Sequence, residues 1–374
     1  MLSCLLLWIR PIWALVLLFT VASATAQIRI GQTAGFTGTA AAGVKEAANG
    51  ARLYIDAVNA KGGVHGQQIE LLSLDDKFDP ALAAENARIL VEEKNVSALF
   101  LTRGTPHTQG IIPVLKKNAV ALIAPSTGAM VLHQPIQRYV FNVRTTYQRE
   151  AEKSVGQLQT MGISRIGILA ADDSFGADAL AGAQKGFAGA KLEPKFIVRF
   201  DRVKPDFAAI AARVAKSDVQ SVLFLGTTAT TADGIKAIRA AGSAAQIVTL
   251  SNNASGGFIK SLGDHARGVI VTQTLPNERS INYAFVKEAQ ELSQQKGAAA
   301  LTPAMLEGFV GAKVLVEGLR RAGKDATRER VLAALEGMRN FDIGGLEIGY
   351  AANDHTGLDF VDLSIINQNG RFAR

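Results

Sequence analysis

The chain has 374 residues, of which 48% are hydrophobic and 20% are charged, and this length suggests about two domains. Its 40 Lys and Arg outnumber 33 Asp and Glu but are scattered, with Lys116-Lys117 and Arg320-Arg321 as the densest pairs. We therefore expect no nucleic-acid partner, which would need a concentrated basic stripe with stacking aromatic residues. The only cysteine is Cys4, so the rest of the chain has no disulfide, thiol nucleophile or cysteine metal ligand.

The first 26 residues have the pattern of a secretory signal peptide. Apolar runs at 2–7 and 12–22 precede Ala24-Thr25-Ala26, which has the small residues of a cleavage site. The alternative is an uncleaved membrane anchor, but Pro11 interrupts the apolar stretch and 12–22 is short for a spanning helix. We expect cleavage after Ala26. The mature chain should be soluble, because no later segment is long and apolar enough to cross a bilayer.

Strands and helices alternate through the rest of the chain. In the first part, the pattern predicts strands at 28–30, 68–74, 98–102, 119–124 and 139–143, and helices at 46–60, 81–95 and 109–117. In the second part, it predicts strands at 165–170, 195–200, 221–225, 246–250, 268–272 and 359–367, and helices at 150–161, 177–188, 205–216, 228–241, 281–295, 302–322 and 327–338. This alternation predicts an α/β fold with two similar lobes, each built on a parallel, doubly wound sheet.

Residues 98–128 form the stretch that is most informative about function. The two apolar runs in this stretch each end in small hydroxyl or glycine residues, around Thr105 after the first and at Ser126, Thr127 and Gly128 after the second. Loops at the carboxyl ends of neighbouring parallel strands form the crevice where ligands bind. Helix N-terminal N–H groups and hydroxyls in that crevice would suit a carboxylate or another anion. The simpler interpretation is that Thr105 and Ser126 only cap helices.

The sequence has no motif that requires catalysis or a nucleotide cofactor. Gly31, Gly35 and Gly38 have the wrong spacing for a dinucleotide fingerprint. Residues 318–325 approach a P-loop, but Asp325 lacks the hydroxyl that would bind magnesium, and the segment ends a helix. No G-x-S-x-G elbow is present. We therefore expect no cofactor.

The titratable residues also have ordinary structural interpretations. Two aspartate pairs could serve acid–base chemistry, but Asp75-Asp76 and Asp172-Asp173 both stand between a strand and a helix, where helix capping is expected. The histidines have no i, i+4 pair, and each is expected at the surface or at a cap rather than on a metal: His65, His107, His133, His265 and His355. The sequence thus favours a binding protein over an enzyme, without a metal site.

Several segments carry a family resemblance through their order and spacing. They are the signal peptide, Asn59-Ala60-Lys61-Gly62-Gly63, Asp75-Asp76-Lys77-Phe78-Asp79-Pro80, residues 105–109, Ala124-Pro125-Ser126-Thr127, Arg144-Thr145-Thr146 and Asp173-Ser174-Phe175-Gly176. Together they resemble the periplasmic leucine/isoleucine/valine-binding proteins of ABC importers, over essentially all of the mature chain.

The resemblance implies a type I periplasmic binding protein, with two α/β lobes joined by three hinge crossovers. Lobe I would comprise 27–145 plus 275–353, and lobe II 146–274 plus 354–374. The crossovers would lie near 144–147, 272–276 and 352–358. A monomer in the periplasm would close its lobes on a small ligand and then dock on an ABC permease in the inner membrane.

The resemblance also implies a set of ligand-binding residues. The family holds a ligand carboxylate with a hydroxyl residue after one strand and a small-residue loop after the next, and these positions match Thr105 and Ser126-Thr127-Gly128. Tyr147 would stack on the ligand or hydrogen bond to it. Thr228 takes the place of an aromatic residue that packs on the ligand from lobe II.

The other half of amino-acid recognition matches less well. Asn252 stands where the family has an acidic residue that binds the ligand ammonium. Arg149 stands at the position of a second acidic residue, unless a shift of the register places Glu150 there. Arg103 stands where the family has an apolar pocket residue. A buried ammonium without a carboxylate partner is costly. We therefore hypothesise a carboxylate ligand without a free α-amino group, such as a dicarboxylate or an aromatic acid. The alternative is that both arginines point to solvent and the ligand is an ordinary amino acid.

Two other classes of function stay open on the sequence alone. The first is a sensor whose loaded form addresses a membrane receptor, which needs the same closing cleft. The second is a secreted α/β enzyme, which would need a reactive constellation that the motifs do not provide.

Overall fold

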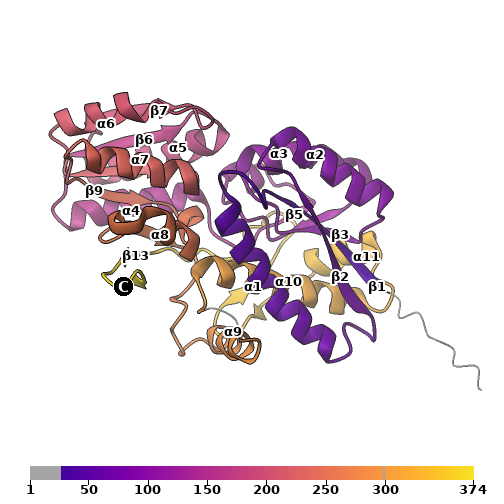
Figure 1. Ribbon diagram of the computed structural model, residues 1–374. Coiled ribbons are helices and arrows are strands. Elements are labelled where there is room, and N and C mark those ends of the chain that lie inside the picture. Colours follow the sequence, from indigo (N-terminus) through magenta and orange to yellow (C-terminus); the bar gives the residue numbers. More distant parts are fainter. Residues whose placement is uncertain (1–26, 298–299) are drawn as a thin grey trace, which may run out of the picture.

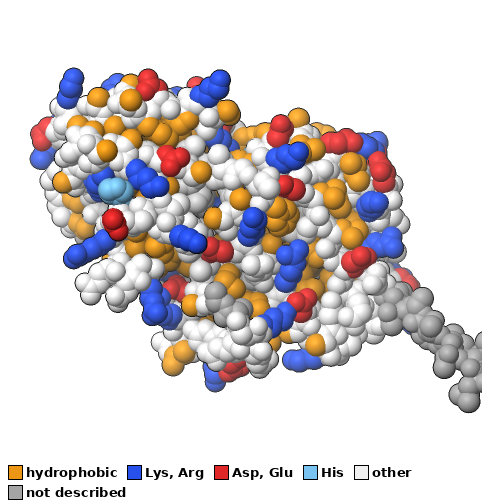
Figure 2. All heavy atoms as spheres, in the orientation of Figure 1, with side chains coloured by type: hydrophobic (Ala, Val, Ile, Leu, Met, Phe, Trp, Pro, Cys, Tyr) orange, Lys and Arg blue, Asp and Glu red, His pale blue; other side chains and the backbone are white. Residues whose placement is uncertain are grey.

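Two α/β lobes lie side by side in the computed structural model, which describes residues 27–297 and 300–374 (Figure 1). The expected signal peptide, residues 1–26, lies outside the described residues. Among the helices of the described part, none combines the length and the apolar character that a membrane crossing requires. On the face shown in Figure 2, Lys and Arg side chains are interspersed with Asp and Glu over both lobes.

The first sheet is wholly parallel and has the strand order β2-β1-β3-β4-β5. Its strands are β1 (Gln27–Ala34), β2 (Gln68–Asp75), β3 (Ala98–Phe100), β4 (Ala121–Ile123) and β5 (Val140–Phe141). The inner strands β3 and β4 are buried along their whole length, which explains their continuous apolar sequences. The strand order reverses between β1 and β3, so the ligand crevice of this lobe is expected at their carboxyl ends.

The second sheet repeats this order and adds two antiparallel strands. Its order is β14-β13-β10-β9-β8-β6-β7, from β6 (Ile166–Ala171), β7 (Phe196–Phe200), β8 (Ser221–Leu225), β9 (Gln246–Thr249), β10 (Ile270–Gln273), β13 (Asp362–Ile366) and β14 (Phe372–Ala373). The strands β6 to β10 are parallel, whereas β13 and β14 are antiparallel. The order reverses between β6 and β8, as it does between β1 and β3. The predicted α/β class and the similarity of the lobes are confirmed.

Most helices occur where the periodicity predicts them. They are α1 (Ala41–Ala60), α2 (Pro80–Arg88), α3 (Thr105–Asn118), α4 (Tyr147–Thr160), α5 (Ser174–Ala190), α6 (Phe207–Lys216), α7 (Thr228–Ala240), α8 (Gly256–Leu262), α9 (Ala284–Gln295), α10 (Pro303–Ala322) and α11 (Arg328–Glu336). The helices α1, α3 and α4 begin earlier than expected, because their first turns consist largely of small or polar residues that show no apolar periodicity. The short α8 and the hairpin of β11 (Phe341–Asp342) and β12 (Glu347–Ile348) were not predicted from the sequence.

Each lobe has its own hydrophobic core. The core beside the first sheet contains residues from 28–143 together with residues from 275–358, because α9, α10 and α11 return to pack on lobe I. The helices α1 and α10 meet at Gly50 and Gly308, where a Cβ atom would lie 1.8 Å from a backbone oxygen of the facing helix. The second core draws on 147–271 and on Ile366 and Phe372. These cores support the proposed division of the chain into two discontinuous lobes.

The chain passes between the sheets three times: after β5, after β10, and between β12 and β13. The first and third passages run together. The amide of Asn142 donates to the carbonyl of His355 at 2.9 Å, and the amide of Leu358 donates to the carbonyl of Val143 at 3.0 Å. Two of the three linkers are therefore hydrogen-bonded to each other rather than independent.

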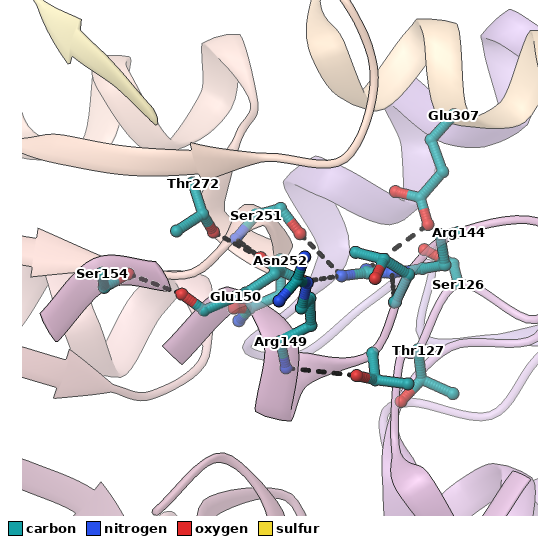
Figure 3. A network of polar contacts seen from close by, with 12 residues as sticks. Ser126, Thr127, Arg144, Arg149, Glu150, Ser154, Ser251, Asn252, Thr272 and Glu307 are labelled. Carbon is teal, nitrogen blue, oxygen red and sulfur yellow. Dashed lines mark hydrogen bonds and ion pairs between the residues drawn. The ribbon is translucent and has the colours of Figure 1, made fainter. Parts of the chain in front are cut away.

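A buried ion pair stands at the centre of this hinge (Figure 3). Arg144 and Glu150 are 2% and 0% exposed, and the Nη2 of Arg144 contacts the Oε1 of Glu150. The other oxygen of Glu150 accepts from the amide of Ser251 at 2.9 Å and from the hydroxyl of Thr272. Arg144 also donates to the Oγ of Ser251 at 2.7 Å and lies 3.6 Å from Glu307 on α10. Five separate segments from both lobes thus meet at one pair of charges.

We predict that Glu150→Gln lowers the free energy of unfolding by about 3–5 kcal/mol, since it leaves a buried guanidinium without its main counter-charge. Urea unfolding followed by circular dichroism measures the change. The matched control is Arg149→Gln at the adjacent position, because Arg149 is half-exposed and lies 3.5 Å from the exposed Asp359. The control should change the free energy of unfolding by less than about 1 kcal/mol. Equal losses in the two variants would contradict the central role of the pair.

Candidate functional site

A cavity lies between the lobes at the carboxyl ends of both parallel sheets. Its walls are formed by Ala40, Phe78, Arg103, Gly104, Thr105, Tyr147, Phe175, Arg202, Thr227, Thr228 and Asn252. These residues follow strands on both sides of the two points where the strand order reverses, which is the expected location of a ligand in such sheets. A wider hollow is lined by α8, α9 and the turn at 369–372, but it contains none of these residues. We therefore take the inter-lobe cavity as the candidate site.

Arg103 is the most unusual residue of the cavity. It is 5% exposed, and its Nη1 donates to the Oγ of Ser126 at 2.6 Å, while its Nη2 donates to the backbone carbonyl of Asn252 at 2.6 Å. Both acceptors are neutral, and Arg103 has no ion-pair partner among the described residues. A buried cation is costly unless it is paired. Arg103 therefore joins the two lobes and leaves one positive charge in the cavity uncompensated.

The loops after β3 and β4 run side by side beneath the cavity. The hydroxyls of Thr105 and Thr127 lie 3.0 Å apart, and the amide of Ser126 donates to the carbonyl of Thr102 at 2.7 Å. The carbonyl of Gly128 accepts from the amide of Tyr147 at 2.7 Å. Ser126, Thr127 and Gly128 thus form a layer that supports the lining residues rather than lining the cavity themselves.

The capping interpretation is wrong for both hydroxyl residues of this stretch. Gly104, with a φ of +93°, is the N-cap of α3, and Thr105 is the first helical residue. The hydroxyl of Ser126 accepts from Arg103 and caps no helix. The helix N-terminus is consequently open towards the cavity.

Two helix N-termini from opposite lobes face the same space. The N-caps of α3 in lobe I and α7 in lobe II, Gly104 and Thr227, make no side-chain capping hydrogen bond. The first residues of these helices, Thr105 and Thr228, line the cavity. The first N–H groups of a helix have no partner within the helix and carry partial positive charge. Both ends therefore add to the positive potential that Arg103 creates.

Phe78, which the sequence analysis did not identify as a lining residue, is held in place by the paired aspartates. Lys77 and Phe78 both adopt left-handed backbone conformations, with φ of +53° and +60°. Asp75 accepts from the amide of Lys77 at 2.9 Å, and Asp76 accepts from the amide of Phe78 at 2.9 Å. Burial raises the pKa of Asp76 to about 6. This pair shapes a loop, and the helix α2 is capped by Asp79 instead.

Arg202 and Phe175 are also lining residues that the sequence analysis missed. The guanidinium of Arg202 lies 5.5 Å from the ring centroid of Phe78 and 5.8 Å from that of Phe175, so it stacks between the two lobes. It pairs with Asp173, which caps α5 by accepting from the amide of Gly176 at 3.0 Å, as the capping interpretation predicted. Arg202 follows the edge strand β7 in a polar segment that resembles an exposed loop. Its position could have been found by applying the strand-end rule to the second lobe.

Two further candidate residues do not line the cavity either. Arg149 is half-exposed and lies 3.5 Å from Asp359. Glu150, the alternative at that position, is buried against Arg144 and Thr272, so it is not free to hold a ligand ammonium. The expectation of surface or capping histidines is wrong for three of them, because His107, His133 and His355 are buried. Within the described residues, no cluster of His, Cys, Asp and Glu could hold a metal ion.

His107 packs behind the cavity wall. Its ring lies 4.1 Å from the ring of Phe78, and burial lowers its pKa from 6.5 to about 4. The folded protein therefore requires the neutral form of the ring. The contribution of the neutral His107 ring to the free energy of unfolding is complete above pH 6.5, the pKa of the ring in the unfolded chain. This contribution is lost as the pH falls towards 4.

We predict that His107→Phe removes this acid sensitivity. Between pH 7 and pH 5 the wild type should lose about 2 kcal/mol of unfolding free energy more than the variant does. Chemical denaturation at both pH values measures the difference. His265→Phe is the matched control, because His265 is exposed, and it should keep the pH dependence of the wild type. A His107 variant with an unchanged pH profile would contradict the prediction.

Comparisons with known proteins agree with this architecture. Residues 27–369 match the family described as periplasmic binding protein. The chain is 27% identical to the Leu/Ile/Val-binding protein BraC3 of Rhizobium johnstonii, over 84% of each chain. It is 22% identical to the leucine-specific-binding protein of Salmonella typhimurium, over 80% of this chain and 84% of the relative.

Solved structures with the same fold cover nearly the whole chain. A substrate-binding periplasmic protein from Ralstonia solanacearum has 29% identity and a TM-score of 0.86, over 92% of this chain and 99% of that protein. An extracellular ligand-binding receptor from Verminephrobacter eiseniae has 26% identity and a TM-score of 0.84, over 93% of this chain and 100% of that protein. These relatives and neighbours are named as binding proteins or receptors rather than as enzymes.

Proposed function

Because this chain belongs to the periplasmic binding protein family, we propose that it captures a small carboxylate-bearing ligand between its lobes and delivers it to an ABC permease. The relatives named for leucine, isoleucine and valine support a transporter of the branched-chain amino-acid type. The location would be the periplasm, after removal of the signal peptide, and we expect a monomer. The observation that carries the proposal is the unpaired, buried charge of Arg103.

The charge of the cavity supports an anionic ligand. Arg103 is buried between neutral acceptors, and the N-termini of α3 and α7, whose N-caps make no side-chain hydrogen bond, face the same space. A ligand carboxylate would compensate the charge, and hydrogen bonds between charged groups are the stronger kind. Of the described residues that line the cavity, none is Asp or Glu. We therefore propose a carboxylate without an α-ammonium group, which would otherwise lack a counter-charge.

Contacts around the cavity support closure of the lobes on the ligand. The carboxylate of Glu46 on α1 accepts from the amides of Gly256 and Gly257 on α8 at 3.0 and 2.7 Å. The amide of Ala229 donates to the carbonyl of Thr39 at 3.1 Å. These hydrogen bonds join the lobes directly, so opening about the hinge would break them. Bound ligand would stabilise the closed arrangement through its contacts with both lobes.

A sensor that addresses a membrane receptor is the alternative, because it needs the same cleft. Loss of ligand uptake after deletion of the gene would favour transport, whereas unchanged uptake with a lost cellular response would favour sensing. An enzyme is disfavoured, because the relatives are named as binding proteins and the aspartate pairs have structural roles.

We predict that simple carboxylic acids stabilise the protein in a thermal-shift screen and that Arg103→Gln weakens their binding about 10-fold to 100-fold. The reason is the loss of a charge-assisted hydrogen bond worth about 1.5–3 kcal/mol. A saturating acid at a hundred times its dissociation constant should add about 2.7 kcal/mol to the wild type. Calorimetric titration of Arg103→Lys, which keeps the charge, should show an intermediate affinity. Arg149→Gln is the control and should bind like the wild type. Stabilisation by leucine or valine, and by no simple acid, would refute the proposed ligand class.

We predict that Glu46→Gln weakens ligand binding about tenfold although Glu46 does not line the cavity. The substitution replaces two charge-assisted hydrogen bonds between the lobes with weaker ones, so the closed form is less favoured. Stopped-flow measurements should show faster dissociation of the ligand with a similar association rate. Glu85→Gln is the control, because Glu85 pairs with Arg88 within α2 on the surface. An unchanged dissociation rate in the Glu46 variant would argue against this closure contact.

A further inference from the structure

Three polar atoms of the lining residues are buried without a hydrogen-bond partner among the described residues. They are the Oδ1 of Asn252, the Oγ1 of Thr228 and the Nε of Arg202, all in lobe II, although the Nη2 of Arg202 pairs with Asp173. Buried polar groups are nearly always hydrogen-bonded in folded proteins, so each such atom in a cavity points to a partner on the ligand. The oxygen of Asn252 is an acceptor only, and its partner must therefore be a donor.

The orientation of the Asn252 amide is determined by its other contacts. Its Nδ2 donates to the carbonyl of Gly226 at 2.9 Å. Rotating the amide by half a turn would place Oδ1 against that carbonyl, and two acceptors would then face each other. The Oδ1 atom consequently remains the group presented to the cavity.

The charges around Asn252 favour a neutral donor on the ligand over a cationic one. The backbone carbonyl of Asn252 accepts from Arg103 at 2.6 Å, so a permanent positive charge lies beside the acceptor. The carboxylate of Glu150, which could have offset a ligand ammonium, contacts Arg144 and accepts from Ser251 at 2.9 Å. A ligand ammonium would therefore meet a cation without meeting an anion.

From this arrangement we infer that the ligand is a 2-hydroxy acid with an apolar or aromatic side chain, an inference that rests on the proposed carboxylate-binding function. Its carboxylate pairs with Arg103 and its hydroxyl donates to the Oδ1 of Asn252. The guanidinium of Arg103 donates to the backbone carbonyl of Asn252, so the side chain of Asn252 belongs to the residue next to the charge, and we place the two ligand groups on neighbouring carbons. The rings of Phe78, Tyr147 and Phe175 form the apolar part of the wall.

The chemistry distinguishes this ligand from its two nearest analogues. A 2-oxo acid offers only an acceptor in place of the hydroxyl, so the Oδ1 of Asn252 stays unpaired in the complex. A 2-amino acid offers donors but brings a positive charge next to Arg103. The hydroxyl alone is both a donor and neutral.

The test compares matched ligands by calorimetric titration at pH 7. One trio is 2-hydroxy-4-methylpentanoate, 4-methyl-2-oxopentanoate and leucine; the other is 3-phenyllactate, phenylpyruvate and phenylalanine. We expect the hydroxy acid of at least one trio to bind tenfold or more tightly than both of its analogues. Oxo acids that bind as tightly as hydroxy acids would overturn this inference and leave the carboxylate function standing. Binding of none of the six would also overturn this inference, and binding of the amino acids alone would refute the ammonium-free ligand class as well.

Variants at Asn252 provide a second readout. Asn252→Asp supplies a carboxylate for an ammonium, so the ratio of hydroxy-acid to amino-acid affinity should fall at least tenfold. Asn252→Leu removes the acceptor, so the preference for hydroxy over oxo acids should disappear. Asn253→Asp is the matched control, because Asn253 is also buried but does not line the cavity, and it should keep the ratios of the wild type. Unchanged ratios in both Asn252 variants would overturn the inference even if one of them is less stable.

Discussion

The ion pair of Arg144 and Glu150 is the interaction on which the two-lobed structure depends. It is buried where the chain first leaves lobe I, and its hydrogen bonds reach the amide and hydroxyl of Ser251, in the turn after β9, and Thr272 on β10. Breaking a buried pair by removing one charge costs more than forming it contributes. The pair therefore acts mainly as a constraint, because only one path of the crossing segments satisfies both charges.

The cavity contains a second buried arginine, Arg103, which lacks the counter-charge that Arg144 has within the described residues. Arg144 has its counter-charge within the protein, whereas Arg103, equally buried, has only the neutral Ser126 and Asn252 as acceptors. A protein that tolerates one uncompensated cation in its interior gains selectivity for a ligand that brings the anion. Since Arg103 reaches from lobe I to lobe II, the guanidinium that we propose attracts the ligand would also contribute to closure. The proposed binding of the ligand and the proposed closure would then be coupled through one side chain.

The fold follows from the sequence more completely than the site does. Alternating apolar strands and amphipathic helices predict both sheets. The strand-end rule indicates Thr105, whereas Arg103, Thr228 and Asn252 were singled out through the family resemblance; all four line the cavity. The resemblance implied Arg149, or Glu150 after a register shift, at the ligand, but Arg149 lies beside Asp359 and Glu150 is buried against Arg144. Phe78 could not be predicted, because its position requires two successive left-handed residues that only the contacts of Asp75 and Asp76 explain.

The shared strand order of the two sheets has a consequence for how ligand choice can change. The loop after β2 and the loop after β7 occupy equivalent places in their sheets, and they contribute Phe78 and Arg202, which stack on each other across the cavity. The loops after β3 and β8 likewise face each other with Thr105 and Thr228. The site is thus two half-sites related by an approximate twofold arrangement, around a ligand that has no such symmetry. On the proposed function, one half would bind the carboxylate while substitutions in the other half change which remaining part of the ligand is accepted, so specificity could change without loss of carboxylate binding.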